Sequence, residues 1–105
     1  MSAYLDNAAT SWPKPETVYQ AVDHFMREVG ATPGRGGHRR EEEAAHIADQ
    51  VRAAIAELFH APDPQGVAFT MNATQAINMA IKGLLSPDDH VITSSIEHNA
   101  MWRPL

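Results

Sequence analysis

The chain of 105 residues contains no cysteine and few basic side chains. Without cysteine it can form no disulfide, no thiolate nucleophile and no cysteine-ligated zinc site. Lysine and arginine number 8 against 13 aspartates and glutamates, which gives a net charge of −5, and there is no basic run. A nucleic-acid-binding surface needs clustered cations to neutralise phosphates. We therefore expect no nucleic-acid partner.

Long apolar runs are also missing. None approaches the roughly 18–20 residues that a membrane span requires, and the N-terminal residues show no basic stretch followed by an apolar one. We therefore expect a soluble, cytoplasmic protein with neither a membrane segment nor a secretory signal. Hydrophobic residues make up 44% of the chain and charged residues 20%, which is typical of a folded chain and not of a disordered one.

Two amphipathic helices are predicted in the first sixty residues. Pro15 suits a first helical position, and Gly30 can end this helix as a left-handed cap. After the glycine-rich loop 31–40, a run of glutamates places negative charge in a first helical turn, and a second apolar stripe continues to about Phe59. The stripe of the first helix is expected in the core and consists of Val18, Val22, Phe25 and Val29.

The rest of the chain predicts a βαβ unit. Short β-like runs at 67–70 and 91–93 flank a third helical pattern that includes Ile77 and Ile81. A right-handed crossover would join two parallel strands, giving an α/β fold with two N-terminal helices and an incomplete parallel sheet. Because helices normally cover both faces of a parallel sheet, we expect a partner or further chain to complete it.

The turn between the first predicted strand and the third helix is a candidate anion site. Small and hydroxyl residues, among them Ala73 and Thr74, open the helix there. Free backbone N–H groups and the positive end of the helix dipole favour a phosphate at such a place. Simple N-capping by Asn72 or Thr74 explains the same residues. The turn matches neither GxGxxG nor GxxxxGK[ST], so no dinucleotide site and no P-loop are indicated.

His98 follows the second predicted strand. Ligands of open α/β sheets bind at the carboxyl ends of strands, so His98 and the Thr74 turn are expected to open on one edge. There the imidazole could stack on a planar ligand or move a proton, or it could be an ordinary loop histidine. Arg35, in the loop Gly34–His38, could meet an anionic ligand or be an exposed turn residue. The six histidines show no metal-ligand spacing, so no metal site is expected.

Four motifs in order resemble those of one enzyme family. They are YLDNAAT at 4–10, GRGGH at 34–38, FTMNATQAIN at 69–78 and EHNA at 97–100, the last followed by RPL at 103–105. Each is short, but together, at this spacing, they resemble the N-terminal quarter of class V aminotransferase-like enzymes, specifically the cysteine desulfurases. The resemblance covers nearly the whole chain. It implies fold type I, the cofactor pyridoxal 5′-phosphate, an amino-acid substrate such as cysteine, and a homodimer.

The resemblance also implies roles for individual residues. Ala73 and Thr74 match the turn that holds the cofactor phosphate through a backbone N–H and a hydroxyl. His98 matches the histidine that stacks on the pyridine ring and assists proton transfer, and it is the one catalytic candidate in this chain. Asn7 and Ala8 match the N-terminal segment that lines the substrate side of the pocket, and Arg35 matches a substrate-binding arginine at the pocket edge, close to the dimer interface. The arginine that binds the substrate carboxylate in this family has no counterpart among these 105 residues.

The resemblance divides the chain into an N-terminal arm with helices, 1–64, and the start of the cofactor-binding large domain, 65–105. Lys14 and Lys82 do not match the lysine that holds the cofactor covalently, and the sulfur-accepting cysteine has no counterpart. We therefore expect the N-terminal part of a cysteine desulfurase or related aminotransferase, inactive by itself. The alternative is a stand-alone, non-catalytic module that binds phosphate compounds or docks onto a partner.

Overall fold

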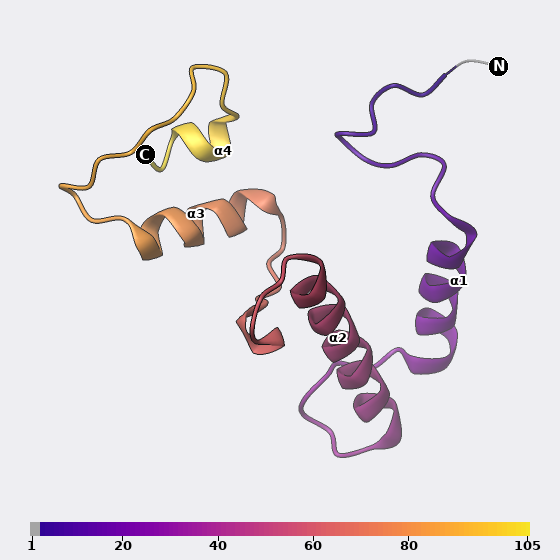
Figure 1. Ribbon diagram of the computed structural model, residues 1–105. Coiled ribbons are helices and arrows are strands. Elements are labelled where there is room, and N and C mark those ends of the chain that lie inside the picture. The colour runs from indigo at the N-terminus through magenta and orange to yellow at the C-terminus, as the bar shows by residue number, and fades with distance from the viewer. Residues whose placement is uncertain (1–2) are drawn as a thin grey trace. The chain divides into compact units, whose positions relative to one another are not determined.

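The computed structural model, which describes residues 3–105, separates into two compact units, Met1–Gly66 and Val67–Leu105. The elements of the first unit are α1 (Glu16–His24), the π-helical turn η1 (Phe25–Val29), α2 (Arg39–Leu58) and the 3-10 turn η2 (Pro64–Gly66). Those of the second unit are α3 (Ala73–Leu84) and α4 (Asn99–Trp102) (Figure 1). Within the described residues, no helix is long and apolar enough to cross a bilayer.

The first helical segment begins and ends close to the predicted residues. Pro15 was expected to be the first residue of the helix, but it lies immediately before α1, which begins at Glu16. The Pro15 carbonyl accepts a hydrogen bond from the N–H of Val18 at 2.9 Å. Gly30 ends the segment in the left-handed conformation with φ +54°. Its N–H donates to the carbonyl of Phe25 at 2.8 Å, the spacing of a π-helical turn. A glycine is favoured here because a Cβ would be strained at this φ.

Helix α2 begins at Arg39, two residues before the predicted run of glutamates, because His38 caps it. The His38 Nδ1 accepts a hydrogen bond from the backbone N–H of Glu41 at 3.2 Å. This side chain satisfies one of the N–H groups that a helix leaves unpaired at its start. Histidine is not among the usual capping residues, and for that reason the pattern of the sequence places the start too late.

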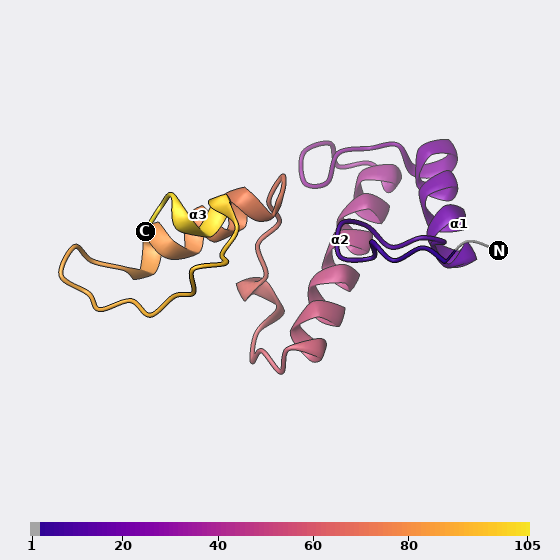
Figure 2. The same cartoon turned by 90° about the horizontal axis from the view of Figure 1, so that it is seen from above.

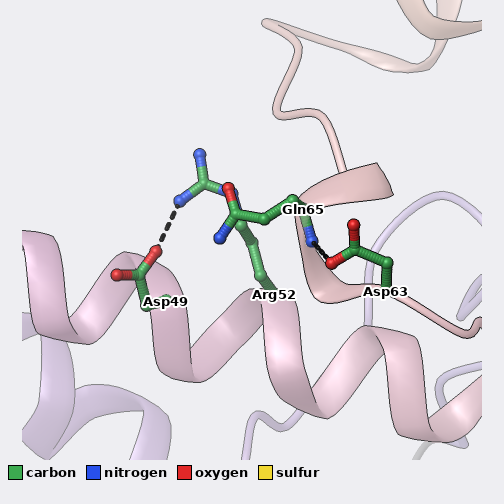
Figure 3. Close-up of polar contacts among 4 residues, drawn as sticks. All are labelled: Asp49, Arg52, Asp63 and Gln65. Carbon is green, nitrogen blue, oxygen red and sulfur yellow. Dashed lines mark hydrogen bonds and ion pairs between the residues drawn. The ribbon is translucent and has the colours of Figure 1, made fainter.

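At its other end, α2 contacts the turn η2. Figure 3 shows the Gln65 side chain extending from this turn toward Arg52 of α2, and Arg52 also pairs with Asp49 at 3.0 Å. The backbone N–H of Gln65 donates to the carboxylate of Asp63 at 2.8 Å. The first of these bonds lies within α2 and the second within the turn, and η2 packs on α2 after the helix ends.

The buried core of the first unit is small and includes residues of η1 and of α2, which pack against each other. Val29 is 1% exposed, and Ala44 and Ala56 of α2 are also buried. Val18 and Val22, from the same stripe as Val29, are exposed, Val22 by 52%. The prediction that the whole stripe forms the core is therefore wrong for the first turns of α1. The stripe has the right period, but only its last turn packs against α2.

The second unit does not contain the predicted βαβ unit. Residues 67–70 and 91–93 form no strand, and the described part of the chain contains no sheet. Phe69 is 55% and Ile92 89% exposed, so these segments lack the cover on both faces that a parallel sheet requires. Runs of three or four residues also form too few ladder bonds to offset the entropy of ordering. The prediction of an α/β fold with an incomplete parallel sheet is therefore wrong for this structure.

In place of a sheet, the second unit packs α3 against α4 (Figures 1 and 2). Ala100 of α4 is buried, and Ile77 and Ile81 of α3 are half-buried. Helix α4 begins after His98, whose Nδ1 accepts a hydrogen bond from the N–H of Ala100 at 3.1 Å. The packing of two helices thus brings residues 73–84 next to residues 98–102. From the sequence, we expected a parallel sheet to bring these segments together.

Truncating Val29 tests where the core of the first unit lies. Val29→Ala removes two buried methyl groups, and we expect it to lower the free energy of unfolding by about 2 kcal/mol. Val22→Ala, on the exposed part of the same stripe, is the matched control and should cost less than about 0.5 kcal/mol. Urea unfolding followed by circular dichroism measures both. Equal losses in the two variants would contradict this description of the core.

Candidate functional site

An open hollow of about 530 Å³ lies between α3 and α4 in the second unit. One face of α3 and the segment around α4 line it with Thr74, Asn78, Lys82, His98, Asn99, Ala100, Arg103 and Pro104. The structure therefore brings Thr74 and His98 to one hollow. They were expected to share the edge of a sheet, but the packing of α4 on α3 places them together.

The start of α3 leaves two backbone N–H groups open. Asn72 caps the helix, because its Oδ1 accepts a hydrogen bond from the N–H of Gln75 at 2.9 Å. The Gln75 side chain reaches back and accepts from the N–H of Met71 at 2.8 Å. Within residues 3–105, the N–H groups of Ala73 and Thr74 have no acceptor. Capping by Asn72 is therefore compatible with an anion site at Ala73 and Thr74.

The charge that lines the hollow is positive. Lys82 and Arg103 belong to the lining and no acidic residue does. Among the described residues, neither cation has an ion pair. Two cations in the lining of a hollow that also contains Thr74, from the start of α3, favour an anionic ligand.

Sequence reasoning assigned no site role to Asn78, Lys82 or Arg103, although all three line the hollow. Thr74, Asn78 and Lys82 stand at spacing i, i+4 and i+8 on α3 and so share one helix face. The Asn78 side chain also donates to the carbonyl of Thr74 at 2.9 Å. This spacing is the signal that would have found Asn78 and Lys82. Nothing comparable in the sequence singles out Arg103, because its place depends on how α4 packs.

The ring of His98 is held by the start of α4. Its Nδ1 accepts the N–H of Ala100, so in the neutral ring the proton resides on Nε2. The side chain is exposed and lines the hollow. This arrangement leaves Nε2 as the nitrogen that can exchange a proton with a ligand.

The predicted substrate-side residues lie in the first unit, whereas Ala73, Thr74 and His98 lie in the second. Asn7 accepts a hydrogen bond from the backbone N–H of Trp12 at 3.2 Å through its side-chain oxygen. All three residues for which a substrate-side role is predicted are exposed: Asn7 and Ala8 in the N-terminal turn and Arg35 in the loop before α2.

One carboxylate holds the loop that carries Arg35. The Glu41 Oε2 accepts hydrogen bonds from the backbone N–H groups of Gly36, at 2.7 Å, and Gly37. The Gly37 N–H is the strongest influence that lowers the pKa of Glu41. Glu41 is only 9% exposed, and this burial raises its pKa against the effect of Gly37. The N–H of Gly36 lowers the pKa again. The net effect is a pKa for Glu41 below the usual value of 4.5.

Comparison with known proteins settles the family. Residues 3–105 match the family model described as Aminotransferase class-V. The chain belongs to the class-V aminotransferase family. Its similarity to cysteine desulfurases, anticipated from the four motifs, is confirmed by relatives that carry this name. No solved structure matches the chain.

Three relatives illustrate the similarity. A probable cysteine desulfurase of Synechocystis sp. is 35% identical over 105 residues, which cover 96% of this chain and 25% of the relative. A probable cysteine desulfurase of Pseudomonas aeruginosa is 35% identical over 104 residues, covering 96% and 26%. Cysteine desulfurase IscS of Dictyoglomus turgidum is 36% identical over 105 residues, also covering 96% and 26%. The chain thus spans about a quarter of the length of these relatives.

Class-V aminotransferases depend in general on pyridoxal 5′-phosphate, and the hollow fits the phosphate of that cofactor. Among its lining residues, Thr74 offers an open N–H and a hydroxyl, Lys82 and Arg103 are cations, and none is acidic. The open N–H of Ala73 directly precedes Thr74 at the start of α3. Within the described residues, no group of three histidine, aspartate or glutamate side chains gathers into a metal site.

The lowered pKa of Glu41 predicts how the first unit responds to acid. A carboxyl group whose pKa is lower in the folded than in the unfolded state stabilises the fold above its unfolded pKa, and this stabilisation is lost as the pH falls through the folded pKa. The wild-type chain should therefore be more stable than Glu41→Gln near neutral pH. The difference should shrink once the pH drops below 4.5.

Urea unfolding at a series of pH values between about 3 and 7 measures this difference. Glu42→Gln is the matched control, because Glu42 lies exposed on the same turn of α2. Its effect on stability should vary less with pH. A Glu41→Gln difference that stays constant over the whole range would contradict the assigned role of the carboxylate.

Proposed function

We propose that this chain supplies the N-terminal, cofactor-binding part of a pyridoxal 5′-phosphate-dependent cysteine desulfurase. The observation that carries the proposal is the hollow shared by Thr74 and His98, with open N–H groups at one end of α3 and the cations Lys82 and Arg103 in its lining. Relatives that are named cysteine desulfurases support cysteine as the substrate. Their names also favour a desulfurase reaction over an aminotransferase reaction.

In this proposal, the cofactor phosphate binds at the start of α3. The N–H groups of Ala73 and Thr74 and the Thr74 hydroxyl donate to its oxygens, and the helix dipole favours its negative charge. Lys82 and Arg103 add positive charge to the same hollow. When bound, the cofactor supplies an electron sink for chemistry at the α-carbon of an amino acid.

His98 acts in the same hollow as the catalytic residue. Its flat ring stacks on the pyridine ring of the cofactor, and the hydrogen bond from Ala100 to Nδ1 fixes the ring orientation. Nε2 is then the atom that holds or moves a proton during the reaction. The short helix α4 serves to position this one side chain.

The first unit contributes the substrate side. In this proposal, Asn7 and Ala8 in the N-terminal turn line the substrate side, and Arg35 lies at the pocket edge, close to the dimer interface, where its guanidinium can meet an anionic group. The second unit begins the large domain that binds the cofactor. The complete protein is proposed to act in the cytoplasm as a homodimer, in line with the family.

Thr74→Val tests the phosphate site. The substitution keeps the β-branched shape and the backbone N–H and removes only the hydroxyl. A hydrogen bond to a charged group contributes about 1.5–3 kcal/mol, so we expect affinity for pyridoxal 5′-phosphate to fall by roughly 10- to 150-fold. Equilibrium titration measures it, with the exposed Thr17→Val of α1 as control. Unchanged affinity in Thr74→Val would count against the assigned site.

His98→Asn separates the ring from the cap. Asparagine is a good N-capping residue, so α4 should persist, as measured by amide hydrogen exchange at Ala100. The stacking and proton-transfer group is lost, and we expect turnover of cysteine by the complete protein to fall by about 100-fold or more. His98→Ala, which loses both cap and ring, is the comparison. Wild-type turnover in His98→Asn would remove His98 from the mechanism.

A further inference from the structure

Helix α4 begins at a side chain that can take up a proton. The helix has four residues, and the N–H groups of Met101 and Trp102 both donate to the carbonyl of His98. The N–H of Ala100 donates to the His98 Nδ1 at 3.1 Å, and among the described residues it has no other acceptor. So short a helix forms few bonds to offset the entropy of ordering it. It therefore depends on this cap and on its packing against α3.

The cap exists only while the imidazole of His98 is neutral. Nδ1 accepts the N–H of Ala100 through its lone pair, and a proton on Nδ1 turns this acceptor into a donor. Two donors would then face each other, and the positive ring would lie at the positive end of the helix dipole. Histidine side chains change their charge between about pH 5 and 8, whereas serine, threonine and asparagine caps do not titrate there.

The groups around His98 do not replace the lost bond. Lys82, on the helix α3 that packs against α4, and Arg103, directly after α4, line the same hollow as His98. Both are cations, and no acidic residue belongs to this lining. Glu97, the neighbour of His98 in the chain, lies outside the lining and accepts a hydrogen bond from the Ser94 hydroxyl at 2.9 Å. A protonated ring thus gains no carboxylate partner within the hollow.

We propose that His98 is a pH-sensitive cap, which holds α4 and the hollow together when its ring is neutral and releases them in acid. One side of the hollow consists of residues of α4 and the two that follow it, so the hollow exists only while α4 is in place. The stabilisation is present above the pH range in which the ring takes up its proton and is lost as the pH falls through it.

The consequence for the cofactor rests on the proposed function, in which the hollow binds pyridoxal 5′-phosphate. When α4 is released, neither His98 nor Arg103 is held in the hollow that Thr74 lines. The affinity for the cofactor therefore falls in acid by more than the chemistry of the phosphate alone accounts for.

NMR spectroscopy of the chain without cofactor, between about pH 5 and 8, tests the cap by itself. As the pH falls, the amide resonance of Ala100 and the Cα resonances of α4 should move toward unfolded values, in step with the ring resonances of His98. The ratio of helical to open α4 should fall about fivefold, which is the typical effect of losing an N-cap.

Two variants control this titration. His98→Asn keeps a capping side chain that does not titrate, so its α4 should not respond to pH. His90→Asn removes another exposed histidine of the second unit, one that begins no helix, and should respond like the wild type. An α4 that is insensitive to pH in the wild type, or that responds equally in His98→Asn, would overturn the proposal.

Equilibrium titration with pyridoxal 5′-phosphate tests the link to the cofactor. The phosphate itself takes up a proton near about pH 6, which weakens its binding to every variant, so the wild type is compared with His98→Asn at each pH. We expect the ratio of the wild-type affinity to that of the variant to fall about fivefold between about pH 8 and 5. A constant ratio would reject the link.

The two proposals fail in different ways. If Thr74→Val leaves the affinity for pyridoxal 5′-phosphate unchanged, the proposed cofactor site fails, while the titration without cofactor still decides whether His98 is a pH-sensitive cap. If cofactor binding depends on Thr74 as expected but the response of α4 to pH does not depend on His98, the cap alone is rejected.

Discussion

Backbone N–H groups at the start of a helix need acceptors, and both units of this chain are organised around that need. His38 accepts one such N–H at α2, Asn72 one at α3 and His98 one at α4, whereas α1 has no side-chain cap. Within residues 3–105, the N–H groups of Ala73 and Thr74 have no acceptor, and Thr74 lies in a hollow whose lining includes the cations Lys82 and Arg103. This setting of the start of α3 underlies the proposed phosphate site.

Features that depend on a few neighbouring residues could be predicted from the sequence. Pro15 and Gly30 bracket the first helical segment closely, because each acts through its own backbone geometry. Asn72 was one of two capping candidates, and the structure selects it. The family also followed from the order of short motifs, since such motifs preserve local chemistry. The placement of Thr74 and His98 in one hollow was anticipated, although by a different route.

Features that depend on distant parts of the chain could not be predicted. The β-like runs at 67–70 and 91–93 have the composition of strands, but a strand exists only with a partner and with cover on its faces. Histidine is an uncommon cap, so the start of α2 was placed too late and α4 was missed. Arg103 lines the hollow because α4 packs on α3, and no residue spacing in the sequence predicts that packing.

The most direct test of the central claim follows the amides of Ala73 and Thr74 by NMR during titration with pyridoxal 5′-phosphate. If the open start of α3 binds the phosphate, these two resonances should shift most and should saturate, while those of Gly36 and Gly37, already bonded to Glu41, should not move. Shifts centred on Gly36 and Gly37, or the absence of a saturating shift at Ala73 and Thr74, would contradict the account.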